Sequence, residues 1–188
     1  MIKNLGEQDR ERHLREIVPE LFKKHDGILY VGCKIKKSGR IPEHVVNFGK
    51  GFVAVLEIDI GNCNGLIDSS YYGNKIHDVV LGDVRKATCY FRDVMFDYSV
   101  WWHGPEHIAL SDLGQAILEL SCLTKKKIIM ACPWGNAPQS AVGGNIAEIH
   151  VQPMYPEYFE KFGFDVYTEG PINRIRNSNI LAVKDVGI

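Results

Sequence analysis

The feature that most constrains the fold is a pair of short apolar segments joined by a polar connection. Residues 27–32 and 51–59 are both rich in β-branched and aromatic residues, and both are short for a helix. Such segments are typical of strands that are buried on both faces of a parallel sheet. Residues 41–49, between them, have Pro42 near the start and Gly49 at the end, as expected of a helix. The pattern predicts a strand–helix–strand crossover, with a ligand outside the carboxyl ends of the strands.

Length and composition restrict the class of protein. The 188 residues and the net charge of −1 are typical of one globular domain with no overall attraction to nucleic acid or to an anionic membrane. No apolar run approaches the roughly 18 residues that a membrane span needs, and the amino terminus does not resemble a secretory signal. Five cysteines without a Cys-x-x-Cys pair argue against a disulfide framework. We therefore expect a soluble, cytoplasmic protein; its oligomeric state is not indicated.

Apolar segments alternate with helical patterns along the rest of the chain. Apolar spacing over residues 8–24, interrupted by Pro19, predicts an amino-terminal helical segment (residues 1–26) packed on the sheet edge. Residues 111–123 predict an amphipathic helix that Ser111 or Asp112 caps, and residues 156–163 predict a shorter one. This alternation indicates a doubly wound α/β domain over residues 27–188. Further strands are expected at residues 78–82, 97–102, 127–132, 164–168 and 180–184.

Two segments carry a resemblance to a known family. In residues 96–108, the pair Glu106-His107 follows the fourth expected strand, and in residues 133–164 a loop leads to a helix of the form Pro-Glu-x-Phe-x-x-x-Gly. Together with the order of strands and helices over residues 27–186, they resemble the class I S-adenosylmethionine-dependent methyltransferases. The resemblance implies a Rossmann-like, mostly parallel seven-stranded sheet with a terminal antiparallel strand pair. It also implies methyltransferase activity and S-adenosylmethionine as the cofactor.

The resemblance assigns cofactor-binding roles to four residues. Glu57 or Asp59 would hold the ribose hydroxyls, because a carboxylate accepts two hydrogen bonds from a diol. Asp83 would accept a hydrogen bond from the adenine amino group. Gly32 would allow the backbone to approach the cofactor closely, since it has no side chain.

Imidazole and indole side chains near the ends of the fourth and fifth expected strands are further candidates. His103 and His107 are the candidate general bases, and a structural, hydrogen-bonded role for His107 is the competing interpretation. Trp102 and Trp134 are candidates for a substrate pocket, with core packing as the alternative. His103 and His107 are four residues apart around Glu106, but an intervening Gly-Pro pair breaks the helical register, so we expect no metal site.

The first glycine motif departs from the family pattern and keeps two alternatives open. Tyr30 and Lys34 stand where the family usually has an acid and a second glycine, as in a catalytically inactive binding or assembly module. Residues 33–40 contain four basic side chains, which are typical of a solvated loop but also suit phosphate in another nucleotide-binding α/β protein. For an active enzyme, the expected acceptor is a small molecule or a cell-surface precursor rather than nucleic acid.

Overall fold

The computed structural model describes residues 2–7, 9–24, 26–32, 51–59, 61, 63–64, 76–171 and 178–187. The helix expected at residues 41–49 and the basic loop at residues 33–40 lie outside the described residues.

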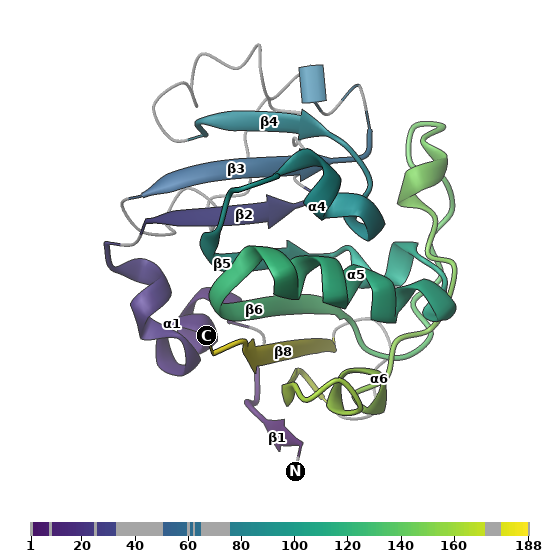
Figure 1. Cartoon of the computed structure of the whole chain (residues 1–188). Coiled ribbons are helices and arrows are strands. Elements are labelled where there is room, and N and C mark those ends of the chain that lie inside the picture. Colours follow the sequence, from purple (N-terminus) through teal and green to yellow (C-terminus); the bar gives the residue numbers. More distant parts are fainter. Residues whose placement is uncertain are drawn as a thin grey trace.

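The described strands form one sheet of eight, in the order β1-β7-β8-β6-β5-β2-β3-β4 (Figure 1). Strand β8 runs antiparallel to β6 and β7, whereas the other pairs are parallel. This confirms the expected mostly parallel, Rossmann-like sheet with its terminal antiparallel strands. The strands are β1 (Lys3–Asn4), β2 (Gly27–Val31), β3 (Phe52–Glu57), β4 (Asp78–Leu81), β5 (Phe96–Trp102), β6 (Thr124–Pro133), β7 (Asp165–Glu169) and β8 (Asn179–Asp185).

Strand β1 is the strand that the sequence did not predict. It is two residues long, both exposed, and pairs with β7 through Lys3 opposite Tyr167 and Asn4 opposite Thr168. A two-residue polar edge strand carries no apolar alternation, so no periodicity in the sequence marks it.

Helical segments cover both faces of the sheet. They are α1 (Arg10–Ile17), η1 (Pro19–Phe22), η2 (Val84–Lys86), α4 (Ala87–Tyr90), η3 (Pro105–His107), α5 (Leu110–Leu123), η4 (Ile146–Glu148) and α6 (Glu157–Glu160). None of the described helices is long and apolar enough to cross a membrane.

The amino-terminal helical segment is divided near Pro19, as the sequence predicts. Its position differs from the prediction, since it covers a face of the sheet rather than an edge. Leu14 and Val18 are buried in the core that also holds Ile28 and Tyr98. The physical reason is that their apolar surface is removed from water by the central strands, where a continuous face is available.

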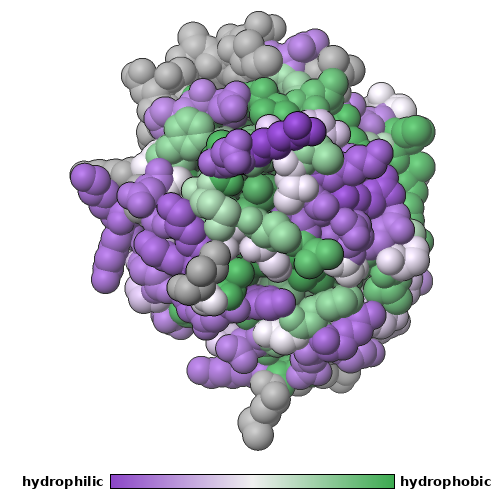
Figure 2. All heavy atoms as spheres, in the orientation of Figure 1, coloured by the Kyte–Doolittle hydropathy of each residue, from purple (hydrophilic) through white to green (hydrophobic). Residues whose placement is uncertain are grey.

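Helix α5 covers the opposite face, as Figure 1 shows. Its start was predicted incorrectly: Ala109 is the N-cap and offers no side-chain hydrogen bond, whereas the Asp112 carboxylate accepts one from Arg85 at 2.6 Å. Leu118 is exposed on the outer side, and Figure 2 shows polar and apolar side chains interspersed over this face. Scattered apolar residues of this kind are ordinary for a protein surface.

The centre of the sheet positions the site. Strand β2 lies between β3 and β5, so the chain leaves β2 in one direction across the sheet and later returns on its other side. At such a switch point the connections diverge and leave a crevice outside the carboxyl ends of the strands.

Candidate functional site

A cavity of about 760 Å³ lies at the carboxyl ends of β2, β3, β4 and β5. This volume is in the range of small-molecule sites, roughly 300–1,000 Å³. The walls are the four strand ends, the segments that directly follow β4 and β5, and part of the segment 134–156, which follows β6 and lies beside these ends on the right of Figure 1. The cavity is therefore where the sequence predicts the ligand.

The ends of β2 and β3 place Gly32 and Glu57 in the cavity wall. Gly32 has a φ of +73°, and no atom of the described residues lies within 4 Å of where its Cβ would be, so none of them blocks the approach of a ligand to this backbone. Glu57 ends β3 and is 4% exposed, and its Oε1 accepts the amide hydrogen of Asp59 at 3.0 Å. Asp59 itself does not line the cavity. Of the two candidate ribose ligands, the structure places Glu57 at the site.

Asp83 follows β4 and lines the same cavity. Both of its carboxylate oxygens accept hydrogen bonds from Arg85, whose Nε is 3.0 Å from each, and this pairing lowers the pKa of Asp83. Arg85 also donates to Asp112 at the start of α5, 2.6 Å away. Arg85 was not predicted from the sequence, although an arginine two residues after an acid is a local pattern that could have indicated it. The arginine orients the Asp83 carboxylate and keeps it ionised at the rim.

The two indoles of β5 lie on opposite faces of the sheet, and both line the cavity. Trp101 is 3% exposed and Trp102 is 4% exposed, so each also belongs to a core. Trp134 is different: its amide donates to the Ser178 carbonyl at 2.9 Å, and its side chain packs on the core without lining the cavity. The structure therefore corrects the pocket role expected for Trp134, because its backbone still continues the pairing of β6 with β8 and its side chain packs on the core.

His103 and Glu106 lie beyond the end of β5. His103 adopts a left-handed backbone conformation, with φ of +51°, which non-glycine residues rarely adopt. Its side chain is 42% exposed, and its Nδ1 is 3.3 Å from Oε1 of the buried Glu106 carboxylate. Such strain tends to persist at functional sites, where the surroundings impose it. The cavity thus contains an accessible imidazole that is oriented by a buried acid.

His107 and His150 face each other next to Glu106. Their ring centroids are 4.9 Å apart, with an angle of 74° between the planes. His107 is the second base candidate from the sequence, and it lines the cavity with His150. His150 was not predicted, because 42 residues lie between it and His107 and no sequence motif links the two histidines.

Backbone contacts fix the segment that carries His150. The amide of Val151 donates to the Glu106 carbonyl at 3.0 Å, and Gln152 donates through its side chain to the Ile108 carbonyl at 2.8 Å. The amide of His150 donates to the Gln139 carbonyl at 3.2 Å. These contacts hold the segment against η3 and place His150 beside the acid.

Comparison with solved structures identifies the fold. The chain is 10% identical to an S-adenosylmethionine-dependent methyltransferase from Clostridium acetobutylicum, over 95% of this chain and 91% of that one, with a TM-score of 0.64. It is 14% identical to the magnesium protoporphyrin IX methyltransferase of Synechocystis PCC 6803, which was crystallised with bound S-adenosylmethionine, over 93% and 78% of the chains (TM-score 0.58). The chain is also 10% identical to an rRNA methylase from Streptococcus thermophilus, over 94% of this chain and 95% of that one, with a TM-score of 0.59.

No protein-family model and no curated protein sequence matches the chain. The structural likeness shows that the chain has the class I S-adenosylmethionine-dependent methyltransferase fold, as expected from the sequence.

Proposed function

We propose that this protein is an S-adenosylmethionine-dependent methyltransferase that acts on a small molecule or a cell-surface precursor. The observation that carries the proposal is the buried carboxylate of Glu57, which shares one cavity with Gly32 and Asp83. A ribose diol supplies two hydrogen-bond donors, and a carboxylate placed where β3 ends can accept both of them.

The residues fit the cofactor in their chemistry and in their placement. Gly32 lets the backbone approach it, Glu57 holds the ribose hydroxyls, and the ionised Asp83 accepts from the adenine amino group. S-adenosylmethionine, when bound, supplies an electrophilic methyl group. His103 removes the proton of the attacking acceptor, since its ring is accessible and Glu106 orients it. His107 is more enclosed, with Nδ1 held 3.1 Å from the Ile149 carbonyl.

Calorimetric titration with S-adenosylmethionine and S-adenosylhomocysteine tests the cofactor site. We expect both to bind, and Glu57→Gln to weaken both by about 10- to 100-fold, since a hydrogen bond to a charged group contributes about 1.5–3 kcal/mol. Asp59→Asn is the matched control: it makes the same chemical change two residues away, on a side chain that does not line the cavity. The affinity of Asp59→Asn for both ligands should stay within about 3-fold of wild type, which is a change of less than about 0.7 kcal/mol in binding free energy.

Two outcomes would contradict the proposal. Folded wild-type protein that gives no heat with either ligand would favour the inactive binding module. Equal losses in Glu57→Gln and Asp59→Asn would show that binding does not use the Glu57 carboxylate. The role of His103 is tested separately: His103→Ala should leave cofactor affinity intact and lower the rate of S-adenosylhomocysteine formation with an accepted substrate by about 100-fold or more.

A further inference from the structure

Three side chains in the cavity wall have potential metal ligand atoms that converge. One oxygen of Glu106 and one ring nitrogen each of His107 and His150 lie within 4.8 Å of one another. Glu106 and His107 come from η3, and His150 comes from the segment 134–156 that docks on it. The cluster exists only because that segment is folded against the end of β5.

Both histidines have the orientation of metal ligands. Nδ1 of His107 is 3.1 Å from the Ile149 carbonyl, and Nδ1 of His150 is 2.5 Å from the Ala137 carbonyl. A carbonyl only accepts hydrogen bonds, so each Nδ1 carries the hydrogen and each neutral ring leaves a lone pair on Nε2. A backbone carbonyl that fixes the other ring nitrogen is the usual support of a histidine that binds a metal.

The Glu106 carboxylate gives an independent indication. The residue is 1% exposed, and its Oε2 has no hydrogen-bond partner among the residues that the structure describes. The nearest imidazole nitrogen of His150 is 3.8 Å from Oε1, which is too far for a hydrogen bond. A buried carboxylate in such surroundings needs further positive charge. Two ligands of one ion at 2.0–2.2 Å lie roughly 3–3.5 Å apart, so the three ligand atoms, which lie within 4.8 Å of one another, must move closer together when the ion binds.

We propose that Glu106, His107 and His150 bind a divalent transition-metal ion. Two imidazole nitrogens and one carboxylate oxygen suit Zn²⁺, Mn²⁺, Fe²⁺ or Co²⁺, whereas Mg²⁺ prefers oxygen ligands alone. Three protein ligands leave coordination positions open, and all three residues line the cavity. Metal binding at this site does not rest on the proposed function.

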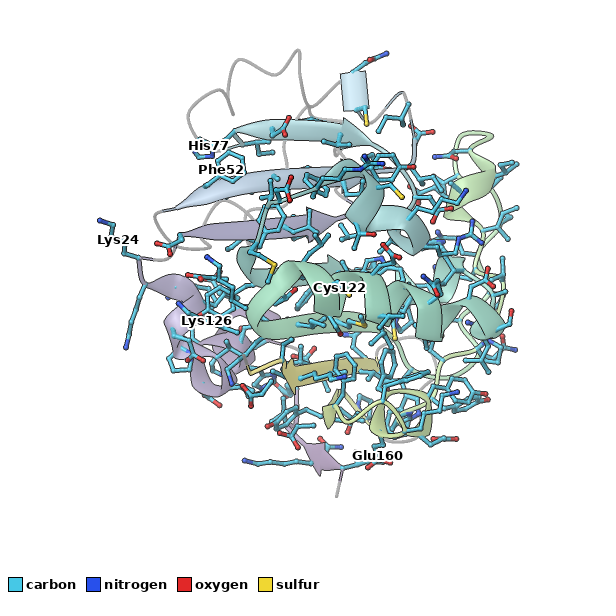
Figure 3. All side chains as sticks on the ribbon, viewed as in Figure 1. Lys24, Phe52, His77, Cys122, Lys126 and Glu160 are labelled. Carbon is cyan, nitrogen blue, oxygen red and sulfur yellow. The ribbon has the colours of Figure 1, made fainter. Side chains whose placement is uncertain are left out.

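Zn²⁺ titration of chelator-treated protein without S-adenosylmethionine tests the site. We expect one tight site in wild type, and a loss on the order of 100-fold in affinity in His150→Ala and in Glu106→Gln, since changing even a residue that supports a ligand costs 10- to 100-fold. Mg²⁺ should bind more weakly than Zn²⁺. His77→Ala is the matched control: His77 is exposed, its ring lies tilted against that of Phe52, and it is at the amino ends of the strands, away from the cavity (Figure 3). It should bind Zn²⁺ as wild type does.

Thermal unfolding supplies a second measurement on the same proteins. Excess Zn²⁺ should raise the unfolding temperature of wild type and of His77→Ala, but not that of His150→Ala. The proposal is overturned if wild type binds no Zn²⁺, or if its tight site persists in His150→Ala, whose side chain lines the cavity and is 11% exposed. Because neither measurement contains S-adenosylmethionine, metal binding and cofactor binding can fail independently of each other.

Discussion

Gly104 is the position at which the packing of the site can be tested most directly. The residue is buried between the end of β5 and η3, and its carbonyl accepts the amide hydrogen of His107 at 3.0 Å. A Cβ added there would lie 2.6 Å from Cε2 of Trp101 and closer still to Nε1 and Cδ1 of the same ring. Carbon atoms in contact are normally about 3.5–4.0 Å apart. In Gly104→Ala, the indole must therefore move by about 1 Å or more.

The indole has little room to move, because Trp101 is 3% exposed and belongs to a core cluster. We expect Gly104→Ala to lower the free energy of unfolding by about 3 kcal/mol, at the upper end of the usual overpacking cost. Gly114→Ala is the control within α5. Its Cβ would be 3.3 Å from the tip of the half-buried Phe162 ring, which can shift. Alanine has a higher helix propensity than glycine by about 1 kcal/mol, and this gain should offset the cost of that close contact.

Urea unfolding of both variants measures the difference, provided that the slope of the transition is unchanged. Adding Trp101→Leu completes a double-mutant cycle, because the smaller side chain makes room for the new methyl group. The loss of unfolding free energy in the double variant should therefore be smaller than the sum of the two single losses by about 1 kcal/mol or more. If Gly104→Ala stays within about 0.5 kcal/mol of wild type, or if the two changes are additive, the packing argument is refuted.

Two further predictions concern ionisable groups. Burial of Asp97 opposes its ionisation, but hydrogen bonds from a backbone amide and from Lys126, 2.9 Å away, lower its pKa overall. Asp97→Asn should therefore cost about 1.5–3 kcal/mol at pH 7, and urea midpoints should show the difference shrinking as the pH falls from about 4 through the lowered pKa of the native carboxylate. Burial, followed by the charges of nearby carboxylates, raises the pKa of Cys63 to about 11. At pH 8, mass spectrometry should show Cys63 alkylated more than about 100-fold more slowly than the exposed Cys89 and Cys122, and similar rates would contradict this.

The sequence by itself determined where the central strands of the sheet lie. The β-branched and apolar segments at residues 27–32, 97–102 and 127–132 became central strands, because a strand buried on both faces needs apolar side chains throughout. Pro19 divided the amino-terminal helical segment, since proline has no amide hydrogen to continue a helix. The position of the cavity at the carboxyl ends followed from the parallel pairing of β2 and β3, because parallel strands end at the same edge.

The tertiary structure decided what the candidate residues can do. Glu57 and Asp59 have the same carboxylate and nearly the same sequence position, and only the end of β3 places one of them in the cavity wall. The local sequence around His150 does not predict its place in the site. Its distance from Glu106 is set by hydrogen bonds between segments more than 40 residues apart. Sequence periodicity reports which face of its own element a residue occupies, whereas a site depends on the packing of elements that are distant along the chain.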